Sequence, residues 1–446
     1  MPAKNSKTVA VIGGGFTGLV AAYRLARAGA NVTLFERGSS LGGLAGDFAL
    51  QGTHIEKTYH HIFRTDRDIL NLVDELGLTD KLIWCNSSLA IFRDGKIYPF
   101  MSPLDVLRFK PCNFFNRLRL GAVAFYLQKR KNWRGLASQS AFNWMRRACG
   151  GQAMRVIWEP LLRGKFDRYF DSVSMAWLWA RIHIRANSRD SADAEKLGYF
   201  RGGFAIITHK LESELLKAGV KILKNSSVEE LAESGGGMKL KIGGQWQEFD
   251  RCLFTGPSSV LAQLLPAGRA DLETYRRQLQ SIDYLGAVCL VFASEQDIGN
   301  FYWLNVNEPG APFLVFINHT KMVDRSFYRN KFVYYIGSYQ PHDSPLFNLA
   351  DEKIISLWLD YLKKIHPQFD ARQIIEQHLF KLKHAQHIVD TNYESKIPDY
   401  RTPLPGLFLA NFSQIYPEDR GTNYAVREGN KIAGMVSQSF NGQTSP

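Results

Sequence analysis

Three glycines near the N-terminus have the spacing of a dinucleotide-binding loop. Gly13, Gly15 and Gly18 follow the apolar run 8–12, and an acid, Glu36, stands 18 residues after the last of them. In such a loop the first glycine permits a tight turn, the second admits a pyrophosphate and the third lets helix and strand pack closely. A carboxylate at Glu36 can accept hydrogen bonds from ribose hydroxyls and would repel a 2′-phosphate, which argues against NADP.

A second glycine pair, Gly42 and Gly43, follows Glu36 by six residues. Such a loop can close over the pyrophosphate and the ribityl chain, which favours FAD over NAD. Here the chain resembles the superfamily of FAD-dependent amine oxidases, protoporphyrinogen oxidases and phytoene desaturases. That superfamily usually has a basic residue after the glycine pair, where this chain has Leu44, and Arg37 can compensate. The resemblance implies cofactor contacts by Gly13, Gly15, Phe16, Thr17, Gly18, Glu36, Arg37, Gly42, Gly43 and Leu44.

The resemblance returns in the middle of the chain. Residues 197–204 resemble a Tyr-x-x-Gly-Gly loop that returns the chain from the substrate domain to the FAD domain, and Tyr199 is therefore a candidate substrate-binding residue. A helix is expected over 206–216 and a strand over 220–223. Val228 matches a residue whose backbone contacts the adenine end of FAD in the superfamily, and an ordinary strand end is the alternative.

The third resemblance lies near the C-terminus. Asn411 stands where the superfamily usually has aspartate, and it can still hydrogen-bond the ribityl chain without adding charge. Thr422 and Asn423 begin a helix that resembles the closing flavin motif, in which the helix N-terminus points at the N1–C2=O edge. Reduced flavin carries negative charge there, so the helix dipole stabilises it. The intervening polar loop 416–420 matches no superfamily motif.

Few residues are candidates for acid–base chemistry. His60 and His61 are adjacent in a stretch that lies close to the flavin ring in the superfamily, so one of them could shuttle a proton. The alternative is that both bond the loop backbone. Lys165 is a third catalytic candidate, near flavin N5 through a water. Lys165 and Arg163 could also hold a substrate phosphate or carboxylate, with surface or interdomain charges as the alternative.

These motifs lie at both ends of 446 residues, which is too long for one compact core. The expected fold class is α/β: a Rossmann-type (GR2-like) FAD-binding domain with a parallel sheet, plus an inserted α+β substrate domain. The FAD domain is predicted to be discontinuous and the substrate domain to fill its gaps. Strand-like runs at 287–292 and 332–336 predict a sheet that floors the site. The predicted ranges are 1–85, 200–285 and 395–446 for the FAD domain, and 86–199 and 286–394 for the substrate domain.

The net charge of +13 is unevenly distributed, because no acid lies between Asp105 and Glu159. In that interval residues 118–127 are apolar apart from Arg119 and have basic residues on both sides. Such a segment suits a helix that lies in an anionic membrane surface or admits a lipid-like substrate. The alternatives are a solvated basic face on core helices, a protein docking surface, and a nucleic-acid groove, which no recognised module accompanies.

Other sequence features limit the classes of protein. No run of about 18 apolar residues predicts a transmembrane helix, and residues 1–4 lack the apolar core of a secretory signal. The five scattered cysteines contain no C-x-x-C pair, so neither a disulfide framework nor a metal site is expected. The expected location is the cytoplasm, with the inner face of the membrane as an option. The oligomeric state stays open.

The function expected is that of an FAD-dependent oxidoreductase that oxidises or desaturates a hydrophobic or amphipathic substrate by hydride transfer to flavin. An isoprenoid or an anionic substrate fits this expectation, and no nucleic-acid partner is expected. Two alternatives remain. One is a flavin-dependent sugar-nucleotide mutase without net redox chemistry, and the other is a non-catalytic flavin-binding scaffold.

Overall fold

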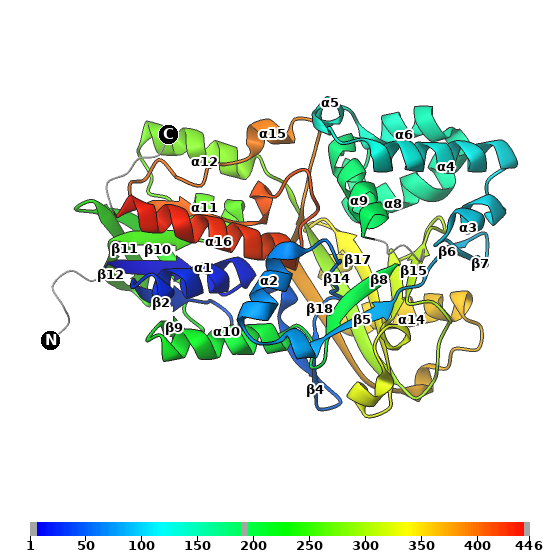
Figure 1. Cartoon of the computed structure of the whole chain (residues 1–446), viewed down its shortest axis with the longest axis horizontal. Helices are drawn as coiled ribbons and strands as arrows, with labels where there is room; N and C mark the ends of the chain where they lie inside the picture. The colour runs from blue at the N-terminus through cyan, green and yellow to red at the C-terminus, as the bar shows by residue number, and fades with distance from the viewer. Residues whose placement is uncertain (1–6, 189–194, 441–446) are drawn as a thin grey trace.

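The computed structural model describes residues 7–188 and 195–440. Residues 1–6, for which the sequence predicts no secretory signal, lie outside the described residues. So do 189–194, within the predicted substrate domain, and 441–446, within the predicted FAD domain. Figure 1 shows a parallel sheet with its helices at one end of the molecule and a helical layer above a larger sheet at the other end.

A five-stranded parallel sheet forms the first part. Its order is β19-β13-β1-β2-β9, and every neighbouring pair is parallel. Because β2 and β13 lie on opposite sides of β1, the connections diverge there and open a crevice beyond its carboxyl end, where such sheets bind ligands. The predicted Rossmann-type sheet is confirmed. Its strands are β1 (Thr8–Ile12), β2 (Asn31–Phe35), β9 (Lys221–Leu223), β13 (Arg251–Phe254) and β19 (Leu407–Leu409).

Four helices accompany this sheet: α1 (Phe16–Arg27), α2 (Arg67–Glu75), α10 (Ala205–Lys217) and α16 (Thr422–Ser439). Helix α16 packs along α1 (Figure 1). The approach is close, because a Cβ on Gly429 would lie 2.8 Å from the Thr17 carbonyl oxygen. The predicted helix over 206–216 corresponds to α10, and the predicted strand over 220–223 corresponds to β9.

Smaller elements surround the parallel sheet. A hairpin with a two-residue turn at Gln51 and Gly52 joins β3 (Asp47–Leu50) to β4 (Thr53–Glu56). A meander and two helices follow α10 along the chain. They are β10 (Val228–Ser234), β11 (Gly237–Ile242), β12 (Gln245–Phe249), α11 (Ser258–Leu264) and α12 (Ala270–Gln280).

A seven-stranded mixed sheet dominates the second part, in the order β18-β14-β17-β16-β15-β6-β7. Every residue of β14 is buried, because α14 (Asp351–Ile365) packs its Ile354 and Trp358 on one face and the other face meets the molecule's interior. The strands predicted at 287–292 and 332–336 are confirmed as β14 and β17. The strands are β6 (Leu89–Arg93), β7 (Lys96–Pro99), β14 (Tyr284–Ser294), β15 (Trp303–Val306), β16 (Val315–Asn318), β17 (Phe332–Gln340) and β18 (Ile374–His387).

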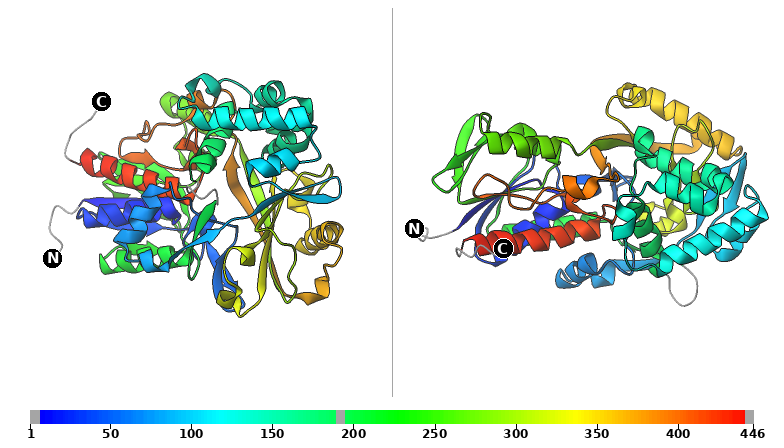
Figure 2. Two further views of the ribbon diagram at one scale, coloured as in Figure 1. Left: turned by 45° about the vertical axis from the view of Figure 1, so that its right-hand side comes forward. Right: turned by 90° about the horizontal axis from the view of Figure 1, so that it is seen from above.

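A helical layer covers this sheet (Figure 2) and packs around buried Phe166, Met175 and Trp177. A two-stranded ribbon connects the helical layer to the first part of the molecule. It pairs β5 (Leu82–Asn86) with β8 (Lys196–Phe200), and two of the predicted domain boundaries fall within it. The helices are α3 (Pro103–Arg108), α4 (Phe114–Lys129), α5 (Arg134–Ala137), α6 (Ala141–Cys149), α7 (Gly151–Ala153), the π-helical turn η3 (Met154–Trp158), α8 (Glu159–Phe166) and α9 (Met175–Asn187).

Short helices complete the described chain. They are α13 (Pro345–Asn348), α15 (Tyr393–Lys396), and the 3-10 turns η1 (Gly43–Ala45), η2 (Thr79–Lys81), η4 (Asp167–Tyr169), η5 (His319–Lys321), η6 (Arg325–Tyr328), η7 (Ala371–Gln373) and η8 (Phe412–Gln414).

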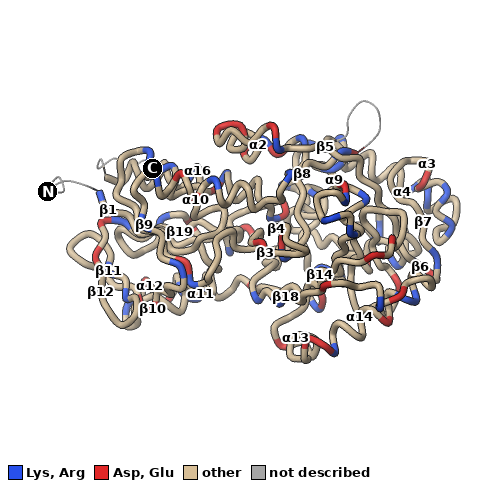
Figure 3. Tube along the Cα trace, turned by 90° about the horizontal axis from the view of Figure 1, so that it is seen from below, with Lys and Arg blue, Asp and Glu red and all other residues tan. Residues whose placement is uncertain are grey.

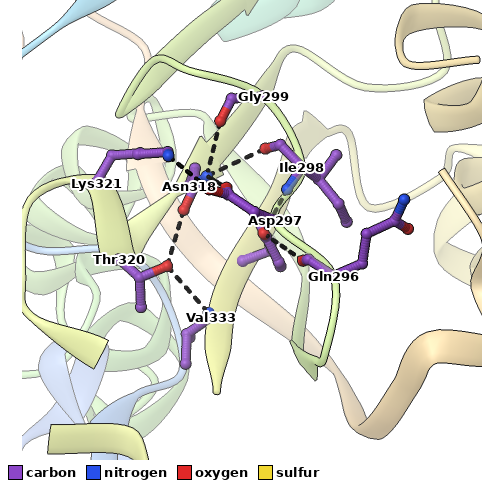
Figure 4. A network of polar contacts seen from close by, with 9 residues as sticks. Gln296, Asp297, Ile298, Gly299, Asn318, Thr320, Lys321 and Val333 are labelled. Carbon is purple, nitrogen blue, oxygen red and sulfur yellow. Dashed lines mark hydrogen bonds and ion pairs between the residues drawn. The ribbon is translucent and has the colours of Figure 1, made fainter. Parts of the chain in front are cut away.

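A buried asparagine holds a loop at the end of β16, the central strand of the mixed sheet (Figure 4). Asn318 ends β16 and donates to the carbonyl oxygens of Ile298 and Gly299, each at 3.1 Å. Its own side-chain oxygen accepts a 2.9 Å bond from Thr320. Because these bonds satisfy the amide within the protein, this network holds a loop in place and offers no group to a ligand.

Candidate active site

The Glu36 carboxylate organises the first glycine loop. It accepts bonds from the backbone N–H groups of Gly14 and Gly38, each at 2.7 Å. A carboxylate has about four acceptor positions, so it can also receive ribose hydroxyls. The second loop lies against the first, because Gly15 and Gly42 form a parallel bridge and the Gly42 N–H donates to Gly14.

The backbone around Gly15 fits the pyrophosphate of FAD. Gly15 is the N-cap of α1 and provides no side-chain hydrogen bond, so the first-turn N–H groups of Phe16, Thr17 and Gly18 point beyond the helix end. A Cβ on Gly15 would meet only the Gly43 Cα at 3.9 Å, whereas a Cβ on Gly18 would lie 1.9 Å from the Gly13 carbonyl oxygen. The protein thus leaves Gly15 open for an approaching anion and uses Gly18 for close packing.

Two further predicted cofactor residues have different surroundings. Val228 begins β10, and the segment before it lies against the Glu36 loop, since the Ser226 N–H donates to the Glu36 carbonyl oxygen. The Asn411 side chain donates to the Gly256 carbonyl oxygen at 2.8 Å and accepts from the Ser413 N–H at 2.9 Å. Because the amide of Asn411 is engaged inside the protein, a ribityl contact would have to replace one of these bonds. Arg37, the residue after Glu36, is exposed.

A large cavity begins at the N-terminus of α16. Its volume is about 860 Å³, and Leu44, Thr422 and Asn423 are among the residues that line it. Gly421 caps α16 without a side-chain bond, so the helix N-terminus faces the cavity with free N–H groups, as the flavin N1–C2=O edge requires. The mixed sheet supplies another wall through Ala287, Cys289, Gly337, Tyr339 and Leu382, which confirms the predicted floor.

His60 and His61 both line the cavity. Burial lowers the pKa of His60 to about 4 and that of His61 to about 3, so both rings are neutral near pH 7. The His60 Nδ1 atom lies 2.7 Å from the Thr58 carbonyl oxygen and must donate to it, which leaves Nε2 as an acceptor. His60 therefore combines the backbone bond and the free nitrogen that the two sequence interpretations proposed separately.

Lys165 lies in a cluster of charges in the cavity wall. Its ammonium is 3.0 Å from the Asp419 carboxylate, which also pairs with Arg181, and Arg420 donates to the Tyr339 hydroxyl at 2.8 Å. All five residues line the cavity. With three cations and one carboxylate, the cluster is net positive and can attract an anionic group.

The pKa values of the cluster follow from burial and from these neighbours. Burial raises the pKa of Asp419, but Lys165 and Arg181 outweigh it and hold that pKa well below its usual range. Burial lowers the pKa of Lys165, and Asp419 offsets only part of this effect. For Tyr339, burial opposes ionisation, yet the neighbouring arginine and lysine lower its pKa.

The structure does not bring two predicted substrate residues to the cavity. Arg163 is exposed and bonds Glu159 one turn earlier on α8, at 2.8 Å. Tyr199 is fully buried and donates to Glu56 at 2.7 Å. The sequence did not predict that the cavity wall would contain Arg181, Tyr339, Asp419 and Arg420, because these residues come from segments far apart in the chain.

The cavity reaches the surface between α3 and α4. Leu107, Leu118 and Phe125 line it and are also 40%, 47% and 62% exposed, respectively. Of the sixteen residues of α4, only Leu120 and Leu127 are buried. Figure 3 shows the lysines and arginines of this end in blue. Among the described residues no helix has the length and apolar character needed to cross a membrane.

The model of a protein family described as flavin-containing amine oxidoreductase matches residues 16–433. The chain belongs to this family. A sequence relative, 4,4'-diapolycopen-4-al dehydrogenase from Metabacillus indicus, is 24% identical over 292 residues, which span 60% of this chain and 59% of that protein. Two solved structures share the fold across nearly the whole chain.

The first of these structures is of a protein from Exiguobacterium sp. 255-15 assigned as a protoporphyrinogen oxidase. It has a TM-score of 0.78 at 19% identity and covers 98% of this chain and 100% of its own. The second is reduced UDP-galactopyranose mutase, with a TM-score of 0.77 at 14% identity, covering 99% and 97%.

Membership of the amine oxidoreductase family agrees with the site. The family and the glycine loops together support FAD as the cofactor, and the chain is an FAD-dependent oxidoreductase by family. Family membership does not identify the substrate, because the similar proteins are named for different substrates.

Proposed function

We propose that this enzyme oxidises or desaturates a hydrophobic or amphipathic molecule that bears an anionic group. Bound FAD supplies the hydride acceptor. The observation that carries the proposal is a single cavity that runs from His60 and the start of α16 to an apolar mouth at Leu118 and Phe125. A small polar amine would not need such a volume or such a mouth.

The chain's own residues divide the work within this cavity. The cations Lys165, Arg181 and Arg420 attract the anionic group and orient the substrate, while Asp419 keeps two of them in place. The apolar walls exclude water, which strengthens these electrostatic contacts. Neutral His60 can accept a proton at Nε2 as the substrate is oxidised.

Anaerobic reduction of the bound flavin tests the substrate class. Long-chain polyene or isoprenoid carboxylates would be compared with their methyl esters and with short polar amines, and loss of the visible flavin absorption would be followed. The carboxylates should bleach the flavin and the esters should do so with weaker apparent affinity. Efficient bleaching by short amines but by no apolar donor would contradict the proposal.

We also propose that α3 and α4 dock on an anionic membrane, at the inner face of the cell membrane, and take up the substrate there. Phe114 and Phe115 are 56% and 78% exposed, and basic residues such as Arg119 and Lys129 lie on the same helix. Each basic residue near such a surface contributes about 1 kcal/mol, and the apolar side chains add burial in the lipid.

Co-sedimentation with vesicles of phosphatidylglycerol and phosphatidylcholine tests the membrane proposal at physiological salt. Phe115→Ser should reduce the bound fraction, whereas Leu216→Ser, which removes a 57% exposed leucine from α10 in the FAD part, should not. Equal loss in both variants, or no binding of the unaltered protein, would refute docking through α4.

A second function has one observation in its favour. The net positive cluster around Lys165 and Arg420 suits a pyrophosphate as well as a carboxylate. A sugar-nucleotide mutase, like the one that shares this fold, needs reduced flavin but no net redox change. Conversion of a UDP-sugar only after dithionite reduction, with no bleaching by apolar donors, would favour this alternative.

A further inference from the structure

A second constellation of chemically active side chains lies away from the cavity. Asp47 on β3, His54 on β4 and His209 on α10 each offer one ligand atom, and these atoms all lie within 4.8 Å of one another. None of the three lines the cavity. The site is therefore independent of the proposed substrate chemistry.

The fold explains how these residues meet. In the β3–β4 hairpin Ala49 pairs with His54 and Asp47 pairs with Glu56, so Asp47 and His54 are diagonal neighbours on one face. Helix α10 packs on β4 and brings His209, one turn into the helix, against this face. The two imidazole rings are 5.4 Å apart and nearly perpendicular, at 89°.

Among the described residues, no lysine or arginine is paired with the carboxylate of Asp47. The Asp47 side chain is only 10% exposed, and the partner it has among the described residues is His54, 2.5 Å away and 53% exposed. A largely buried carboxylate is usually paired with a cation. The partner of Asp47 is an exposed imidazole rather than a lysine or arginine, and a second imidazole stands beside it.

We propose that Asp47, His54 and His209 bind a divalent transition-metal ion of the zinc class. Imidazole nitrogens and carboxylate oxygens are ligands that zinc prefers, at bond lengths of about 2 Å. Ligand atoms of one tetrahedral ion lie about 3.3 Å apart at that bond length, so exposed His54 and His209 need only small rotations. Three protein ligands leave a position for water, and the ion ties the hairpin to α10.

Zinc titration of the FAD-loaded, tag-free and chelator-treated protein tests this site by calorimetry. The unaltered chain should bind one Zn²⁺, and His209→Ala and His54→Asn should each weaken binding by about tenfold or more. His378→Ala is the matched control. His378 also pairs with a carboxylate, Glu376 at 2.8 Å, but no third ligand accompanies that pair among the described residues.

Thermal unfolding gives a second readout, because an ion that binds only the folded chain raises its melting temperature. Zinc should raise the melting temperature of the unaltered protein and of His378→Ala, and raise that of His209→Ala by clearly less at the same zinc concentration. Unchanged flavin content shows that the variants fold. Absence of zinc binding, or equal binding by His209→Ala and the unaltered chain, would overturn the proposal.

Discussion

The pyrophosphate end and the cavity end of this enzyme offer different kinds of binding group. At the first end the binding groups are backbone amides, which Gly15 exposes and which Glu36 aligns. At the second end they are long side chains, and Lys165, Arg181 and Asp419 hold one another in place. The first site belongs to one short segment, whereas the second is assembled from distant parts of the chain.

The two kinds of site are therefore disrupted by different kinds of substitution. A backbone site fails when a side chain occupies the ligand's space, even though the fold survives. A buried charge cluster fails when one member is removed, because the remaining charges lose their partner in a poorly solvated place. Single substitutions in each region test that contrast.

The largest effect is expected for Asp419→Ala. It leaves the buried Lys165 ammonium and Arg181 without their carboxylate, which should lower the free energy of unfolding by about 3 to 5 kcal/mol. Asp343→Ala is the control, since its 2.9 Å pair with Arg168 is exposed to solvent and should contribute little to stability. Urea unfolding measures both, and similar losses would break the contrast.

The next effect concerns Glu56, a fully buried carboxylate outside both regions that serves as a reference. Burial, despite bonds from Tyr199 and Phe204, raises the pKa of Glu56 to about 7 from an ordinary value of 4.5. Between these values the folded chain keeps a proton that the unfolded chain has released. Stability should therefore fall as pH rises through this window, by about 3 kcal/mol in all.

Glu56→Gln should remove this contribution, so the variant gains stability relative to the unaltered protein between pH 4.5 and pH 8. Urea unfolding at both pH values measures the gain. A difference between the two proteins that stays constant with pH would show that Glu56 does not titrate as described.

A smaller effect is expected for Gly15→Ala, which tests the backbone site. The added Cβ meets nothing closer than 3.9 Å in the protein, so the fold should survive. It would occupy the approach of the pyrophosphate and weaken FAD binding by about tenfold or more, or at least about 1.4 kcal/mol. Flavin titration of the apoprotein measures this. Gly434→Ala, where a Cβ has open space on α16, should leave FAD affinity unchanged.

The smallest effect on stability is expected at the exposed start of α4. Phe115→Ser removes a side chain that is 78% exposed, so the free energy of unfolding should change by no more than about 0.5 kcal/mol. A larger loss in urea unfolding would mean that Phe115 packs against the protein, and would weaken the case for a membrane-facing α4.

The sequence was sufficient for features that depend on local order. The glycine loops, Glu36 and the strands and helix around them lie within one short segment. Their order and spacing predicted a dinucleotide site, and the second glycine pair, with the family resemblance, favoured FAD. The start of α16 was predictable for the same reason, since helix N-termini have a local signature at Gly421 and Thr422. The surroundings of Asn411 could not be predicted from the sequence, because its bonds to Gly256 and Ser413 depend on tertiary packing.

Which charged residues share the cavity depends on the tertiary structure. Arg163 and Lys165 are two positions apart on α8, yet Arg163 faces solvent and Lys165 meets Asp419, because successive helix positions point in different directions. The same holds for His54 and His209, which the hairpin and α10 bring together from distant positions. Charge pairs between remote segments leave no spacing in the sequence, since only the packing of helices and sheets sets their distance.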